Sequence, residues 1–241
     1  MTRGYIQKKH ITILGILSVL FLVASVYFYQ IGDPVMFRAM RGIICFAFLF
    51  VLYFFQKNRV NWIIVLFLIL YGTSSFASIW YDENNIATLS MGLNFLAFLL
   101  LVGALSPKIH FKKMNLLFTS IFVILVLVNG YLLYLFVEMI RDFALNDLHY
   151  FLIFLGAMSL VFSGFCVLLY NHEYSTKASL IFTLFIFVMI FAEVFRAIAI
   201  YDFAYGSASV HVARGLLILA ISLLVHYELS DKKPAEILGR R

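Results

Sequence analysis

Residues 178–201 read ASLIFTLFIFVMIFAEVFRAIAIY, a run in which only Glu193 and Arg196 carry a charge. A helix that crosses a bilayer needs about 20 mainly apolar residues, so this stretch predicts a transmembrane helix. It lacks the alternation of apolar and polar residues that is typical of a membrane β-barrel strand. Its two charged residues are three positions apart and therefore share one helix face.

The composition of the whole chain indicates the same class of protein. Of 241 residues, 64% are hydrophobic and 12% are charged, and the mean hydropathy is +1.00. Soluble domains have about 45–50% apolar and roughly 25% charged residues, so a soluble enzyme, a disordered chain and a disulfide-stapled secreted module are excluded. Cys45 and Cys166 lie in apolar runs without C-x-x-C spacing, and no disulfide, metal site or cofactor is expected.

We therefore expect an all-α, polytopic membrane protein that forms a single membrane domain over residues 1–241. Eight apolar runs are long enough to span. They are Ile11–Tyr29, Val35–Phe55, Val60–Tyr81, Asn85–Ser106, Met114–Ile140, Tyr150–Tyr170, Ala178–Tyr201 and Ser207–Tyr227. Asp33-Pro34 suits the start of the second helix, because aspartate caps helices and proline is tolerated at the first helical position.

The basic residues predict the orientation of the chain. One set of loops and tails carries 13 of the 18 Lys and Arg residues, whereas the opposite loops carry only Arg141. The 13 are Arg3, Lys8, Lys9, Lys57, Arg59, Lys108, Lys112, Lys113, Lys177, Lys232, Lys233, Arg240 and Arg241. The positive-inside rule then places both termini in the cytoplasm of a multi-pass protein of the cell membrane. Because the basic residues serve orientation, no nucleic-acid partner is expected; the oligomeric state is left open.

A weak internal repeat divides the chain. Residues 79–82 read IWYD and residues 199–202 read AIYD, an offset of 120. Two four-helix halves follow, about 11–106 and 114–228. Because each half has an even number of spans, the halves enter the membrane in the same direction. The alternative is a chance alignment of helices of similar length.

Charged residues inside spans are costly and are functional candidates. Four arginines and three acidic or imidazole groups remain there, all in the predicted non-cytoplasmic half. They are Arg38, Arg41, Arg196, Arg214, Glu138, Glu193 and His211. Converging arginines suit an anionic head group, because guanidinium binds phosphate or carboxylate through a bidentate fork. Glu193 and His211 are candidate acid–base groups.

Each of these residues also has a structural interpretation. Glu193 and Arg196 can neutralise each other within one helix. Arg38 can extend to the membrane interface, where His211 can also lie. Thr73 and the serines that follow it can serve close helix packing. Arg41 and Arg214 have no acid one turn away in their own helix, so they need a partner from another helix or a ligand.

The layout resembles the YhhN-type lysoplasmalogenase family, whose members carry Gly-Asp in the third helix and Ser-Asp in the seventh. The segment Leu70-Tyr71-Gly72-Thr73-Ser74-Ser75 is similar to the first motif, with Thr73 at the position of the acid. Phe191-Ala192-Glu193 is similar to the second, with Glu193 in place of aspartate. The repeat offset pairs Thr73 with Glu193. The basic residue that the family carries early in the second helix corresponds to Arg38 or Arg41.

This resemblance implies a membrane hydrolase of lipid metabolism that cleaves the vinyl-ether bond of lysoplasmalogens, with Glu193 and Thr73 as catalytic positions. Threonine at position 73 leaves one carboxylate, while the usual division into acid and base needs a second group. His211 or Glu138 is the candidate for that group.

Three functions are compatible with the sequence. The first is a lipid hydrolase, or a relative that only binds a lysophospholipid or another anionic amphiphile at Arg38, Arg41, Arg196 and Arg214. The second is a transporter or binding protein for a small organic anion. The third is a non-catalytic membrane partner or sensor in which the polar cluster is structural.

Overall fold

The computed structural model describes residues 2–56, 60–108, 116–200 and 206–230, and these residues form helices and short links without a strand. Eight helices longer than three residues follow the predicted spans closely, except that the first begins earlier. Their bounds are α1 Thr2–Gln30, α2 Pro34–Gln56, α3 Trp62–Ala77, α4 Asn84–Leu105, α5 Leu116–Met139, α6 Asp147–Tyr174, α7 Lys177–Ile200 and α8 Gly206–Leu229. Three 3-10 turns follow longer helices: η2 Ser78–Trp80, η3 Ser106–Lys108 and η5 Arg141–Phe143.

Short polar side chains determine where three of the helices begin. Asp33 accepts a hydrogen bond from the Met36 amide through Oδ1 at 2.9 Å, which confirms the predicted cap of α2. Asn61 caps α3 by accepting from the Ile63 amide at 2.9 Å. Asn146 caps α6 in the same way at 2.7 Å. Each cap satisfies a backbone donor that the first helical turn leaves without an intrahelical partner.

The prediction of an all-α membrane protein is confirmed, because seven helices within the described residues are long and apolar enough to cross a bilayer. The remaining predicted span, 114–140, coincides with α5. The apolar part of α5 within the described residues is Val123–Met139. Because this described apolar part is shorter than each of the other seven candidate spans, the count of eight spans stays a prediction.

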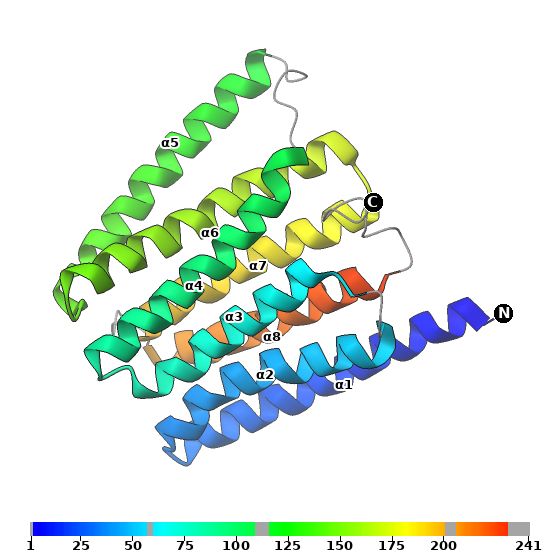
Figure 1. Ribbon diagram of the computed structural model, residues 1–241, viewed down its shortest axis with the longest axis horizontal. Coiled ribbons are helices and arrows are strands. Elements are labelled where there is room, and N and C mark those ends of the chain that lie inside the picture. The colour runs from blue at the N-terminus through cyan, green and yellow to red at the C-terminus, as the bar shows by residue number, and fades with distance from the viewer. Residues whose placement is uncertain (1, 57–59, 109–115, 201–205, 231–241) are drawn as a thin grey trace.

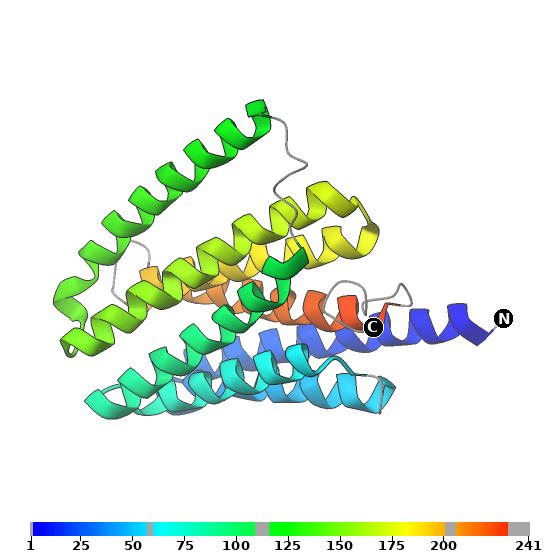
Figure 2. The same ribbon diagram turned by 45° about the horizontal axis from the view of Figure 1, so that its top comes forward.

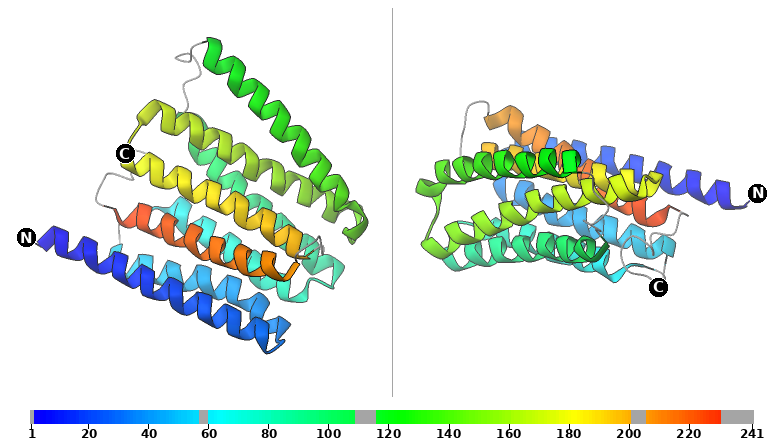
Figure 3. Two further views of the ribbon diagram at one scale, coloured as in Figure 1. Left: turned by 180° about the vertical axis from the view of Figure 1, so that it is seen from behind. Right: turned by 90° about the horizontal axis from the view of Figure 1, so that it is seen from above.

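The helices pack side by side with α1 and α5 at opposite edges of the bundle (Figures 1 and 3). Consecutive helices α1 to α4 pack pairwise, and so do α5 to α8. Between these two groups α4 packs against α6, while α8 packs against α1 and α2. The two helices at the edges of the bundle differ in how they pack. Helix α1 lies against both α2 and α8, whereas α5 packs mainly on α6 and diverges from α4 (Figure 2).

Helix α1 begins and α8 ends at the same end of the bundle (Figure 1). The turns after α1 and α3 lie at the other end. Most of the basic residues used to predict the orientation lie outside the described residues or at helix ends whose side chains are not described. Which end of the bundle faces the cytoplasm therefore stays a prediction. The second repeat segment, at 201–202, also lies outside the described residues, and the division into repeat halves stays a prediction.

Candidate functional site

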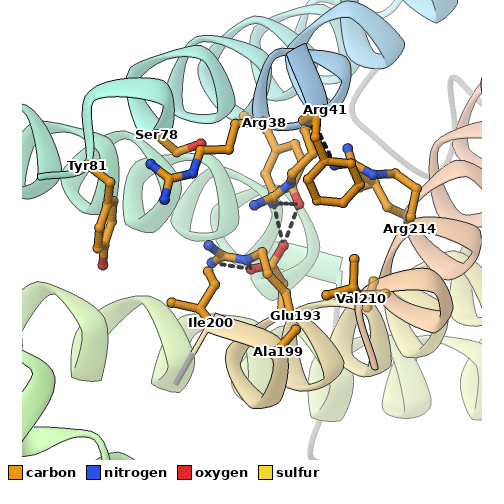
Figure 4. A pocket seen from close by; sticks show the side chains of 15 residues that line it. Arg38, Arg41, Ser78, Tyr81, Glu193, Ala199, Ile200, Val210 and Arg214 are labelled. Atoms are coloured by element: carbon orange, nitrogen blue, oxygen red, sulfur yellow. Dashed lines mark hydrogen bonds and ion pairs between the residues drawn. The ribbon is translucent and has the colours of Figure 1, made fainter. Parts of the chain in front are cut away.

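A cavity of about 300 Å³ lies between α2, α3, α7 and α8, at the end of the bundle where α2 begins and α7 ends. Figure 4 shows its side chains converging from these helices. All four arginines predicted as ligand-binding residues line this one cavity, together with Glu193. Its polar lining consists of Arg38, Arg41, Tyr71, Ser78, Tyr81, Glu193, Arg196 and Arg214.

Glu193 is held by groups from three helices. Its Oε2 accepts a hydrogen bond from Arg196 Nε at 2.8 Å, which is the predicted pair within α7. Its Oε1 accepts from Arg41 Nη2 of α2 at 3.0 Å and from the Tyr71 hydroxyl of α3. The prediction that Arg41 needs a partner from another helix or a ligand is therefore confirmed, because Arg41 of α2 forms an ion pair with Glu193 of α7. The side chains of Arg41, Glu193 and Arg196 are at most 18% exposed, so solvent screens their ion pairs only weakly.

A close approach of α2 and α3 brings Arg41 to Tyr71. A Cβ atom on Gly72 would lie 2.9 Å from Phe46 Cε2 and 3.1 Å from Cys45 Cβ, so any other residue would force these side chains or the two helices to shift. Arg41 Nη2 then donates to the Tyr71 hydroxyl at 2.6 Å. On the other side of α3, Ser74 and Ser90 exchange hydrogen bonds to each other's carbonyl oxygens at 2.7 and 2.8 Å. These serines hold α3 against α4, as small residues do in membrane helices.

Arg214 differs from Arg41 and Arg196 because no acid balances it among the described residues. It is 5% exposed, and its Nη2 donates to the Phe37 carbonyl oxygen at 2.7 Å. Its guanidinium carbon lies 4.4 Å from the centre of the Phe37 ring, in a cation–π contact. Its Nη1 is buried and has no hydrogen-bond partner among the described residues. A charged donor lining a cavity is therefore left unsatisfied.

Arg38 and Tyr81 lie near the C-terminal end of α3. Arg38 Nη1 donates to the Ile79 carbonyl oxygen at 3.3 Å, so the side chain turns toward η2. The Tyr81 hydroxyl lies 2.8 Å from His149 Nε2. His149 Nδ1 accepts from the Leu145 amide at 3.2 Å, so Nε2 carries the proton and donates to Tyr81. This link ties the wall of the cavity to the start of α6.

The three predicted catalytic residues do not come together. Glu193 lines the cavity, but Thr73 is exposed on another face of α3 and is not among the described lining residues. His211 packs its ring against Tyr29 with the centroids 4.8 Å apart, outside that lining. Glu138, the other candidate for a second acid, is bound to Arg141 at 3.1 Å and to Tyr150 at 2.9 Å. Whether any of these residues is catalytic stays a prediction.

Tyr71 is the residue that sequence reasoning missed. It lies two positions before Thr73, and positions two apart in a helix point in nearly opposite directions. Tyr71, Ser74, Ser75 and Ser78 follow the helical spacing of one face, and three of these residues are buried in the bundle while Ser78 lines the cavity. That periodicity was the signal for the inward face of α3.

The chemistry of the cavity suits an anion. Four guanidinium groups and one carboxylate give a formal charge of +3 when Tyr71 is neutral. Among the described residues, no group of three His, Cys, Asp or Glu side chains is arranged to hold a metal ion. In comparisons with known proteins, no family model, no curated protein and no solved structure gave a significant match. The resemblance to lysoplasmalogenases therefore rests on the layout and the two short motifs alone.

Proposed function

We propose that this membrane protein binds an anionic amphiphile of the lysophospholipid type, whose anionic group occupies the arginine-lined cavity. The observation that carries the proposal is the unsatisfied hydrogen-bond donor of Arg214. Arg214 lines the cavity, and its Nη1 is a buried charged donor without a partner among the described residues. A phosphate or carboxylate oxygen there would satisfy it and would supply the negative charge that the protein does not.

The other arginines support the same ligand chemistry. Glu193 neutralises part of the charge of Arg41 and Arg196 and holds both side chains in fixed positions. Because both side chains are already ordered, they lose little conformational entropy when their remaining N–H groups bind a ligand. A preorganised site gains affinity in this way. Arg38, near the C-terminal end of α3, adds a further positive charge to the lining of the cavity.

The proposal concerns binding and does not include hydrolysis. Two arginines and a tyrosine already donate to the Glu193 carboxylate, which leaves it poorly suited to take up or release a proton. Thr73, where the resemblance places an acid, is exposed outside the described lining. Release of a fatty aldehyde from a lysoplasmalogen by the purified protein, abolished in Glu193→Gln, would add catalysis to the proposed binding.

Binding is tested with purified protein in phosphatidylcholine nanodiscs. The probes are dodecyl phosphate, dodecyltrimethylammonium and dodecanol, which share a chain and differ in the charge of the head group. We expect dodecyl phosphate alone to bind and to raise the unfolding temperature. Arg214→Gln should weaken its binding by about 10- to 100-fold, as expected for loss of a charge-assisted hydrogen bond.

Arg141→Gln is the matched control, because Arg141 is exposed at the same end of the bundle and pairs with Glu138 outside the cavity. Its affinity for dodecyl phosphate should equal that of the wild type. Equal binding of the three probes, or equal loss of affinity in the two arginine variants, would refute the proposal.

A further inference from the structure

A second cavity, of about 100 Å³, lies between α4, α5, α6 and α7. Apart from Asn94, Glu193 and Arg196, every described residue that lines it is apolar or glycine. Its α5 wall is one helix face, formed by Leu133, Phe136, Val137 and Ile140 at positions i, i+3, i+4 and i+7. We call it the apolar cavity.

The two cavities are continuous in their lining. Glu193, Arg196 and Ile200 of α7 line both of them. The arginine-lined cavity lies on the α2–α8 side of these residues, and the apolar cavity lies on the α4–α6 side. A ligand that passes these three residues would have its anionic group on one side and apolar surroundings on the other.

One polar atom of the apolar cavity is unsatisfied. Asn94, near the middle of α4, is 7% exposed, and its Oδ1 is buried without a hydrogen-bond partner among the described residues. A buried amide oxygen without a donor is costly and calls for an explanation. A hydroxyl or N–H group on a bound ligand would satisfy it. A water would need about two to four polar partners, and besides Asn94 the described lining offers only Glu193 and Arg196, which bind each other.

The arrangement of α5 leaves this side of the bundle accessible to lipid. Helix α1 packs on both α2 and α8, whereas α5 packs mainly on α6 and diverges from α4 (Figure 2). Apolar side chains on several faces of α5 are exposed, among them Leu127, Leu132 and Leu135. An alkyl chain can therefore leave the apolar cavity along α5 without passing through water.

We propose that the ligand is a single-chain amphiphile with a hydrogen-bond donor between its anionic group and its chain. The chain occupies the apolar cavity and the donor binds Asn94 Oδ1. This inference rests on the proposed function, because the anionic group is taken to lie among the arginines. It adds a second binding site and a requirement for a hydroxyl or N–H group near the head of the ligand.

The donor is tested with 2-hydroxydodecyl phosphate and dodecyl phosphate, which differ by one hydroxyl group. In nanodiscs the hydroxylated probe should bind the wild type ~10-fold more tightly, as one buried hydrogen bond allows. Asn94→Leu should abolish this preference. Asn129→Leu is the control, since Asn129 is exposed on α5 and bonds only to the Leu125 carbonyl oxygen of its own helix among the described partners.

The chain site is tested by filling the apolar cavity. Gly156 lines it, and a Cβ atom there would meet only Phe95 at 3.9 Å, so a leucine at this position can project into the space. Gly156→Leu should weaken dodecyl phosphate binding ~10-fold while leaving butyl phosphate binding unchanged. Gly103→Leu is the control, because no atom lies within 4 Å of the added Cβ among the described residues. The unfolding temperature of each variant without ligand reports whether it is folded.

The outcomes separate the two proposals. A hydroxyl preference that is absent from the wild type or persists in Asn94→Leu overturns the donor site. Equal loss of butyl and dodecyl phosphate binding in a folded Gly156→Leu protein overturns the chain site. In both cases binding that still depends on Arg214 leaves the proposed function intact, whereas probes that bind independently of Arg214 refute that function itself.

Discussion

Replacing Arg214 with methionine is expected to stabilise the ligand-free protein while weakening its affinity for the anion. Arg214 is a buried cation without an acid partner among the described residues. Replacing buried ion pairs with well-packed apolar residues of similar volume is often neutral or stabilises proteins by about 1–4 kcal/mol, and Arg214 bears the burial cost without the compensating acid. Methionine is unbranched and flexible, so it can follow the path of the arginine side chain over Phe37.

Two contacts of Arg214 place the expected gain at the low end of that range. The hydrogen bond to the Phe37 carbonyl oxygen, at 2.7 Å, is of the charge-assisted kind, which contributes about 1.5–3 kcal/mol. The cation–π contact at 4.4 Å contributes about 1–2 kcal/mol when desolvated. Against these stands the desolvation of a whole guanidinium group, which costs several kcal/mol and leaves Nη1 without a partner among the described residues. The expected net gain is therefore about 1–2 kcal/mol.

The measurement is the unfolding temperature in nanodiscs, followed by intrinsic fluorescence. For a chain of this length, 1 kcal/mol shifts the midpoint by about 2–4 °C, so Arg214→Met should unfold roughly 2–8 °C higher than the wild type. At the same concentration, dodecyl phosphate should raise the midpoint of the wild type clearly more than that of the variant, whose affinity is weaker. Arg141→Met is the control, since its side chain is 66% exposed, and it should shift the midpoint little in either direction.

A lower unfolding temperature for Arg214→Met would refute the reasoning. It would mean that the contacts with Phe37 outweigh the cost of burial and that Arg214 is a structural residue. An unchanged temperature together with an unchanged response to dodecyl phosphate would show that Arg214 neither bears a desolvation cost nor binds the anion.

Three further substitutions have expected outcomes that the same unfolding measurement checks. Glu193→Gln removes the charge that Arg41 and Arg196 share, and breaking a buried pair should destabilise the protein by about 3 kcal/mol; a change below 1 kcal/mol would mean that the pair is effectively solvated. Gly42→Ala should destabilise by about 1–3 kcal/mol, because the added Cβ would lie 2.5 Å from Phe76 Cδ2; a gain in stability, the usual effect of alanine in a helix, would show that the ring moves at no cost. Thr73→Val should change stability and dodecyl phosphate affinity by less than about 0.5 kcal/mol, since Thr73 is exposed outside the described lining; a large loss of affinity would restore the role that the family resemblance implies.

The helices could be predicted from sequence because each apolar run is set by the thickness of a bilayer. Asp33 could be predicted as a cap because it acts within three residues of itself. The arginines could be assigned to one site because each charged residue inside a span needs a partner, and their positions along the chain place them at one end of the bundle. These are local or length-based constraints, which a single sequence carries.

The contacts between helices could not be predicted in the same way. Nothing in the sequence of α2 says that Arg41 meets Glu193 of α7, because that pairing depends on how far apart the helices pack. The choice between residues on α3 has a different basis. Matching a family motif selected Thr73, whereas the helical periodicity of its neighbours selects Tyr71, and the hydrogen bond to Glu193 is made by Tyr71.

The polar residues of the bundle divide according to whether the protein satisfies them. Glu193, Arg41 and Tyr71 satisfy one another, and such a closed set holds three helices in register whether or not a ligand is bound. Arg214 Nη1 and Asn94 Oδ1 are unsatisfied among the described residues, and they line two cavities that meet at α7. A donor with positive charge and a neutral acceptor match one amphiphile that has an anionic group and a nearby hydroxyl. Packing alone would favour apolar residues at both positions, so their cost to stability is the strongest argument that both serve a ligand.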